Sequence, residues 1–183
     1  MNSLIESRLS GRRAPEPGSG LAAGLIGGVA GSLAMVAFHG AWSWAFRSPT
    51  RPAEHDVAGD AANPAAEPST VRGARALVER VTARPLSAAE ARVAGRLFHF
   101  AFGAGLGGAY GVLAEYVPFA AAGAGVPFGA LQVVFADELS VPALGLSESP
   151  RHAPAAEHLR ALGAHVIYGV TAELVRRRLR SRR

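Results

Sequence analysis

Long segments without charge are the feature that most constrains the fold of this 183-residue chain. Pro17–Phe46, Leu97–Ala114 and Tyr116–Ala136 contain no Asp, Glu, Arg or Lys. About 20 apolar residues suffice for a helix to cross the hydrocarbon layer of a bilayer. Charged residues make up only 18% of the chain, below the roughly 25% of an average soluble domain. We therefore expect an all-α fold, a polytopic membrane helix bundle of about four transmembrane helices.

The first span is predicted at residues 19–46, after a basic N-terminal tail at residues 1–18. A pair of arginines before the apolar stretch would also fit a secretory signal. However, the stretch is longer than the roughly 7–15 residues of a signal core, and no clear cleavage site follows it. Trp42, Trp44 and Phe46 end the stretch in the way that aromatic residues mark a membrane interface. The segment is therefore expected to remain as a transmembrane helix.

A helix-capping motif precedes the second span. Ser87 and Glu90 have the spacing of a capping box, in which each side chain bonds the exposed backbone amide of the other residue. A helix over Ala88–Tyr116 is longer than the apolar layer, and Pro118 ends it. The third span is predicted at Tyr116–Ala136.

The fourth candidate, Ala161–Ala172, has only 12 uncharged residues, fewer than a full span needs. Arginines at its ends can lengthen it, because their stems stay in lipid while their charges reach the interface. A short amphipathic helix on the membrane surface is the alternative. The second, third and fourth spans together make a predicted membrane region at residues 88–175, followed by a basic C-terminal tail at residues 176–183.

Residues 47–87 between the first two spans contain five of the prolines and many of the charges, which predicts a water-facing loop. Within this loop, arginines and one glutamate take the face opposite to a set of apolar residues. This pattern suits either a short helix on anionic lipid headgroups or a solvated amphipathic turn. The apolar set is Val71, Ala74, Leu77, Val78 and Val81.

Four spans place both termini on the same side of the membrane. The arginines of the two tails favour the cytoplasm as that side, because loops rich in Arg and Lys tend to stay there. The loop from Arg47 to Arg92 carries seven arginines of its own and opposes this orientation.

Small residues recur at four-residue spacing along one face of the second helix. Such rows let two membrane helices approach closely. We therefore predict tight packing of the first helix against the second, with Gly105 and Gly108 outside the contact. The row on the second helix is Gly95, His99, Gly103, Gly107, Gly111 and Glu115, and the matching row on the first is Gly20, Gly24, Gly28 and Ser32.

Ionisable residues are costly in a bilayer, so those in the spans should face the bundle or the interface. Tracing four alternating spans places Glu115 and Glu173 in the half of the membrane near the termini. Three or more histidines with one or two carboxylates in the other half could form a metal site or a proton relay. No H-x-x-H or H-E-x-x-H spacing supports a metal site, and interfacial histidines without chemistry are the simpler interpretation. The candidate polar cluster of this half is His39, His99, Asp137, Glu138, His158 and His165.

No catalytic residue, cofactor or nucleic-acid partner is predicted. The glycine-rich runs lie inside apolar spans and not between a strand and a helix, as a nucleotide site requires. The chain has no Cys, so thiolate chemistry and Cys-ligated metals are excluded. The net charge is +5, but the sequence has neither a zinc-binding pattern nor a basic helix interleaved with aromatics, the features that would indicate nucleic-acid binding. We expect the lipid bilayer as the partner of these basic residues.

Four stretches together resemble the YagU-type family of bacterial inner-membrane proteins, a domain of unknown function. They are the glycine-rich first span with Trp44 and RSPTRP, the run HFAFGAGLGGAYGVLAEYVP, the segment PALGLSESP, and HVIYGVTAELVRRRLR. The resemblance implies a multi-pass protein of the bacterial inner (cytoplasmic) membrane. It implies no catalytic or ligand-binding residues.

Two function classes follow. The first is a tightly packed helix bundle with a structural or accessory role and no chemistry. The alternative is a small ion- or proton-coupled transporter or channel that uses the His, Asp and Glu residues opposite the termini. Four glycine-rich helices enclose little space, so this alternative calls for a homo-oligomer. An intramembrane enzyme would require a metal or paired acids.

Overall fold

The computed structural model describes residues 14–46, 68–134 and 155–181. Throughout these residues the regular structure is helical, which confirms the all-α fold class for this part of the chain. The elements are α2 (Pro17–Ala45), α3 (Ser69–Thr82), α4 (Ala88–Tyr116), the 3₁₀ helix η2 (Pro118–Gly125), α5 (Val126–Gln132) and α7 (Ala155–Ser181).

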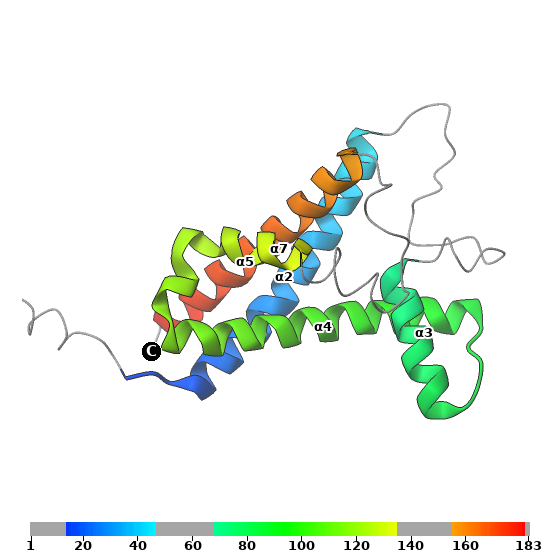
Figure 1. Ribbon diagram of the computed structural model, residues 1–183, viewed down its shortest axis with the longest axis horizontal. Coiled ribbons are helices and arrows are strands. Elements are labelled where there is room, and N and C mark those ends of the chain that lie inside the picture. Colours follow the sequence, from blue (N-terminus) through cyan, green and yellow to red (C-terminus); the bar gives the residue numbers. More distant parts are fainter. Residues whose placement is uncertain (1–13, 47–67, 135–154, 182–183) are drawn as a thin grey trace, which may run out of the picture.

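Three long helices form the body of the protein. α2 and α7 lie side by side and run in opposite directions, and α4 crosses α2 obliquely (Figure 1). η2 and α5 pack on α7. α3 packs on the first turns of α4, away from the α2–α7 pair (Figure 1).

Local signals explain where the helices begin. Pro17 occupies the first turn of α2, where its missing N–H would be unpaired in any residue. The capping box starts α4: the Glu90 N–H donates to Ser87 Oγ at 3.3 Å, and the Ser87 N–H donates to Glu90 Oε2 at 2.9 Å. The helix over Ala88–Tyr116 has the bounds that this motif and the following proline predict.

The segment predicted as a third span differs from one continuous helix in its described part. The chain leaves helical geometry at Ala122, Gly123 and Ala124 and then forms α5, which has 7 residues. Gly123 and Gly125 have φ angles of +67° and +87°, a region that glycine enters without a steric penalty. At about 1.5 Å per residue, α5 alone is too short to cross a bilayer. The length of the apolar run predicted a continuous span here, whereas the glycine and proline residues determine where the backbone leaves the helical conformation.

α7 has 27 residues, more than twice the apolar run that suggested the fourth span. Residues 176–181, expected as a tail after that span, are its last turns. Among the described residues, α2 and α4 are long and apolar enough to cross a membrane by length and composition. α7 has the length, but its last turns carry Glu173 and several arginines.

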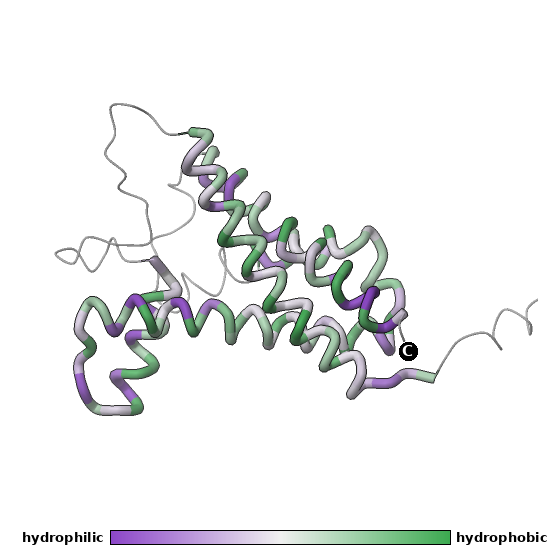
Figure 2. Tube along the Cα trace, turned by 180° about the vertical axis from the view of Figure 1, so that it is seen from behind, coloured by the Kyte–Doolittle hydropathy of each residue, from purple (hydrophilic) through white to green (hydrophobic). Residues whose placement is uncertain are grey.

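Apolar residues are distributed in reverse of the pattern in a soluble domain. Large side chains such as Ile26, Leu33 and Leu97 are exposed, at 55%, 57% and 67% respectively. Alanines and glycines dominate the buried positions, together with Ser32, Gln132, Glu173 and Arg176. Figure 2 shows hydrophilic stretches in α3 and near the C-terminus, with apolar stretches along the long helices.

Candidate functional site

Backbone contact between α2 and α4 replaces side-chain packing where the two helices cross. A Cβ atom built on Gly20 would lie 2.7 Å from the Gly111 carbonyl oxygen, and one built on Gly107 would lie 2.6 Å from Gly28 Cα. Real Cβ atoms essentially never approach other atoms within 3.0 Å. The two predicted rows therefore meet over Gly20, Gly24, Gly28 and Ser32 on α2 and Gly103, Gly107 and Gly111 on α4.

Two glycines of α4 lie differently from the expected arrangement. Gly95 faces α3, where a Cβ would lie 2.7 Å from Val71 Cγ2. The exclusion of Gly108 from the contact is wrong, because a Cβ there would lie 3.0 Å from Leu21 Cδ1 and 3.1 Å from Leu25 Cδ2. These leucines reach around the row of small residues and widen the contact. Gly105 has nothing within 4 Å of such a Cβ.

α7 uses small residues on two faces. Toward α2, a Cβ on Gly27 would lie 2.6 Å from the Ala172 carbonyl oxygen. Toward α5, a Cβ on Gly169 would lie 2.7 Å from the Gly129 nitrogen. Each helix of the body is therefore held by backbone-to-backbone contact with a neighbour.

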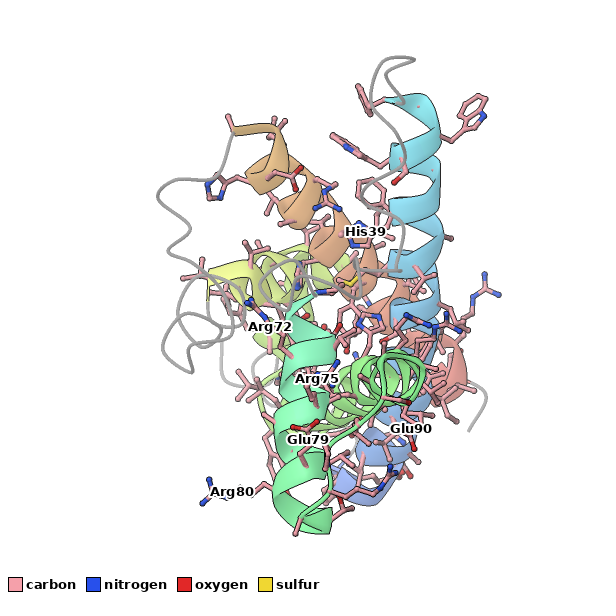
Figure 3. The ribbon with its side chains drawn as sticks, turned by 90° about the vertical axis from the view of Figure 1, so that its right-hand side faces the viewer. His39, Arg72, Arg75, Glu79, Arg80 and Glu90 are labelled. Carbon is pink, nitrogen blue, oxygen red and sulfur yellow. The ribbon has the colours of Figure 1, made fainter. Side chains whose placement is uncertain are left out.

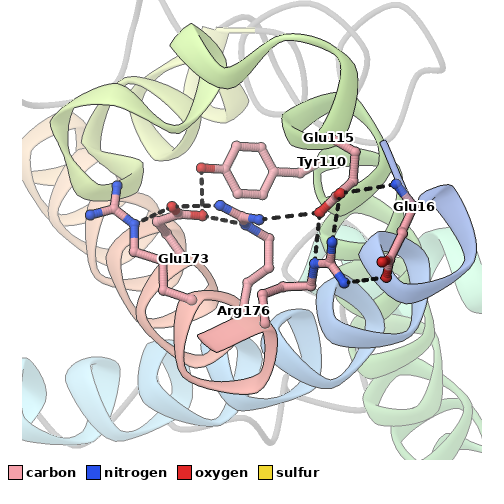
Figure 4. Close-up of polar contacts among 7 residues, drawn as sticks. Glu16, Tyr110, Glu115, Glu173 and Arg176 are labelled. Carbon is pink, nitrogen blue, oxygen red and sulfur yellow. Dashed lines mark hydrogen bonds and ion pairs between the residues drawn. The ribbon is translucent and has the colours of Figure 1, made fainter. Parts of the chain in front are cut away.

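A network of charged and polar side chains joins the helices at the end of the body where α2 begins and α4 and α7 end (Figure 4). We call it the charged network. Its members are Glu16, Tyr110, Glu115, Glu173, Arg176, Arg177 and Arg180.

Glu173 is the centre of the charged network and is 0% exposed. Arg176 donates to both of its carboxylate oxygens, from Nε at 2.7 Å and from Nη2 at 2.9 Å. Arg177 Nε donates to Oε1 at 2.5 Å, and the Tyr110 hydroxyl donates to Oε2 at 2.9 Å. Four donors thus compensate a carboxylate that is removed from solvent, as a buried charge requires.

Glu115 holds the other side of the charged network. Arg180 donates to its two oxygens from Nε at 2.9 Å and from Nη2 at 2.8 Å, while Arg180 Nη1 donates to Glu16 Oε2 at 2.9 Å. The Glu16 N–H donates to Glu115 Oε2 at 3.2 Å, and Arg176 Nη1 lies 3.8 Å from Glu115 Oε1. The start of α2 and the ends of α4 and α7 are therefore connected through one carboxylate.

The charged network is balanced, because its three glutamates match its three arginines. Arg177 also donates to the backbone carbonyl of Ala121 at 2.6 Å and so attaches η2. The arginines lie in the last turns of α7, where positive charge is favoured by the helix dipole. With each carboxylate engaged by arginine, this arrangement fixes helix ends and offers no unpaired acid for proton transfer.

The sequence placed Glu115 and Glu173 in the same half of the membrane, and the structure brings both into the charged network. Glu173 and Arg177 are four residues apart on α7, a spacing that places them on one face of the helix. Glu16, Tyr110 and Arg180 were missed, because only the packing of α2, α4 and α7 brings them to the acids.

The histidines of the candidate polar cluster lie away from the charged network. His39 on α2 lies between α2 and α7 (Figure 3) and interacts electrostatically with His99 on α4 and His165 on α7. His165 also has its Nδ1 2.9 Å from the Ala161 carbonyl oxygen. His158 lies in the first turns of α7 and is half-buried.

Within the described ranges, no three His, Asp or Glu residues lie close enough together to hold a metal ion. Asp137 and Glu138 lie outside these ranges. His39 Nδ1 and His99 Nε2 are buried without a hydrogen-bond partner in the part of the chain that the structure describes. Three imidazoles, one from each long helix, therefore lie near one another, but the described residues form no group that could hold a metal ion.

Comparison with protein families gives a match over most of the chain. The family described as "Protein of unknown function (DUF1440)" matches residues 35–174, more than half of the chain. This range includes Tyr110, Glu115 and Glu173 of the charged network. No curated protein and no solved structure matches the chain significantly. The chain therefore belongs to the DUF1440 family of proteins of unknown function.

Proposed function

We propose that the protein is a multi-pass protein of the bacterial inner membrane with a structural or accessory role, a closely packed helix bundle without chemistry of its own. The resemblance to YagU-type proteins supports this location. In this proposal α2 is the first crossing of the bilayer and α4 is the second. The η2–α5 segment belongs to the third crossing, and α7 is the fourth.

The observation that carries this proposal is the reversed distribution of apolar side chains. Large aliphatic and aromatic residues cover the outside of α2 and α4, while glycines, alanines and polar groups fill the contacts between helices. In water, this arrangement would leave the apolar surface unprotected and gain little from burial. In lipid it is the expected one, because helix association there depends on close packing of small residues and on polar contacts.

The structural role follows from how the polar groups are used. The acids of the charged network are each engaged by arginine, so their charges stabilise helix ends. The α2–α4 crossing is filled by backbone contact and leaves no passage between these two helices. Both features support a packed bundle over the transporter or channel.

The location is tested by washing membranes of the expressing bacterium with alkaline carbonate. The protein should stay in the pellet and be released only by detergent. Release by carbonate alone would contradict the membrane proposal.

The role is tested by proton flux into liposomes that contain the purified protein and a pH-sensitive dye. The expected flux equals that of empty liposomes under an imposed pH gradient. A flux that needs the protein and disappears in His99→Ala would contradict the structural role and favour the transporter.

A further inference from the structure

The hairpin formed by α3 and the start of α4 carries an excess of basic residues. We call residues 69–97 the basic hairpin. It contains six arginines and two glutamates, which give a formal net charge of +4. α3 docks on α4 with Val71 against Gly95, and Val71, Ala74 and Ala91 are all buried.

Both acids of the basic hairpin are already engaged inside it. Glu79 Oε1 accepts the Leu86 N–H at 2.8 Å and lies 3.5 Å from Arg75 Nη1. Glu90 pairs with Arg84 at 2.7 Å besides its role in the capping box. The positive charge of the other arginines is therefore not compensated locally.

The uncompensated arginines are Arg80, Arg92 and Arg96, none of which has an ion pair with another described residue. Arg80 points away from the rest of the protein (Figure 3). Nε of a fourth arginine, Arg72, is buried and has no hydrogen-bond partner among the described residues. Such guanidinium groups bind phosphate oxygens well, because their donors match the geometry of the anion.

Exposed apolar side chains lie beside these charges. Leu77 and Val81 on α3 are 54% and 76% exposed, and Val93 on α4 is 55% exposed. The apolar face of α3 is therefore only half covered by α4. Its uncovered half fits the acyl region just below a layer of headgroups.

The position of the basic hairpin along the chain selects the bilayer as the occupant. α4 runs without interruption from Arg96 into the apolar segment Leu97–Ala114. If that segment lies in the hydrocarbon layer, as the proposed function requires, Arg92 and Arg96 lie within two turns of it. α3 is packed on the same turns of α4, so the whole hairpin lies at the level of the headgroups.

We propose that the basic hairpin is a docking surface for anionic lipid headgroups, with Leu77 and Val81 inserted at the acyl boundary. Arg80, Arg92 and Arg96 pair with the phosphates. Each arginine at an anionic surface strengthens binding by about fivefold. The surface therefore distinguishes anionic from zwitterionic lipid. This inference rests on the proposed membrane location.

The chain has no cysteine, so a single cysteine can be introduced and spin-labelled without first replacing native cysteines. Leu77→Cys and Val81→Cys report on the apolar flank of α3. Ala76→Cys is the matched control, because it is exposed on the arginine-bearing side of the same helix. Leu33→Cys on the exposed face of α2 reports on membrane insertion itself. Each labelled protein is reconstituted into nanodiscs of phosphatidylcholine, with or without phosphatidylglycerol.

The measured quantity is the collision rate of each label with a water-soluble nickel chelate. With phosphatidylglycerol, the labels at 77 and 81 should be shielded from the chelate and the label at 76 should not. In pure phosphatidylcholine, the collision rates of the labels at 77 and 81 should rise to that of the control label at 76. The same rise should follow in the triple variant Arg80→Gln, Arg92→Gln and Arg96→Gln.

Two results would overturn the inference. Labels at 77 and 81 that stay open to the chelate with phosphatidylglycerol would leave an acidic protein as the better partner. Labels shielded equally in both lipids would show insertion without recognition of charge. A shielded label at 33 in either case keeps the membrane proposal intact, whereas an open label at 33 removes that proposal as well.

Discussion

Glu173 shows how single residues hold this fold together. A carboxylate without solvent contact would be strongly destabilising alone, and here two arginines and a tyrosine from two helices compensate it. Removing one member of such a group leaves a buried partner without its nearest counter-charge or hydrogen bond, which costs more than the ion pair itself contributes.

Glu173→Gln should lower the free energy of unfolding by about 3–5 kcal/mol, because Arg176 keeps its buried charge and loses its closer counter-charge, while Glu115 remains at 3.8 Å. Glu157→Gln is the matched control on the same helix, since Glu157 pairs with Arg160 in a partly exposed position and such pairs contribute only about 0.2–1 kcal/mol. Chemical unfolding in mild detergent measures both values. Equal losses would show that Glu173 is not buried as described.

Tyr110 offers a finer test of the same group. Tyr110→Phe removes the hydrogen bond to Glu173 and keeps the ring that stacks on Phe128 at a centroid distance of 4.1 Å. The expected loss is about 1.5–3 kcal/mol, the range for hydrogen bonds to charged groups. Tyr116→Phe changes an exposed tyrosine of the same helix and should have almost no effect in the same unfolding assay. A Tyr110 variant as stable as the control would contradict the assigned bond.

At the scale of helices, close backbone contact decides how α2 and α4 pack. The glycines at the crossing leave no space for a methyl group. A glycine on the outward face of the same helix lacks that constraint, so the two kinds of position should respond oppositely to alanine.

Gly107→Ala should destabilise the protein by about 1–3 kcal/mol, because the new methyl group overfills the contact with Gly28. Gly105→Ala should stabilise it by up to about 1 kcal/mol, because alanine is the better helix former and nothing lies near the new Cβ. Thermal unfolding in detergent compares the two. Changes of the same sign and size at both positions would contradict the close backbone contact at Gly107.

Periodicity and capping predicted what depends on neighbours in the sequence. Ser87 and Glu90 located the start of α4, and the four-residue rows located the faces that meet at Gly24 and Gly107. Apolar length misled at Gly123 and Gly125, where left-handed backbone breaks the expected helix. It also underestimated α7, because the charges that ended its apolar run, Arg160 and Glu173, are paired with charges on the same helix and so do not interrupt it.

The same limit applies to the charged network. Arg180 and Glu16 stand at opposite ends of the chain, 164 positions apart, and no local pattern relates them. Their contact exists because α2 and α7 run in opposite directions, so the start of one helix lies beside the end of the other. Identifying the network therefore required the tertiary structure.

At the scale of the whole molecule, the ends of the helices define two opposite faces. The charged network joins the start of α2 to the ends of α4 and α7. The end of α2 and the start of α7 lie together at the far side of the body (Figure 1). If the body crosses the bilayer, these two groups of helix ends must be exposed to different compartments.

Single-cysteine labelling with a membrane-impermeant maleimide in oriented membrane vesicles tests this claim most directly, since the natural chain has no cysteine to mask. Gly18→Cys, Tyr116→Cys and Ser181→Cys are exposed positions near the charged network, and Phe46→Cys and Ala155→Cys are exposed positions at the far side. The first three positions should be labelled from one side of the membrane and the last two only from the other. Labelling of Gly18→Cys and Phe46→Cys from the same side would contradict a body that crosses the bilayer.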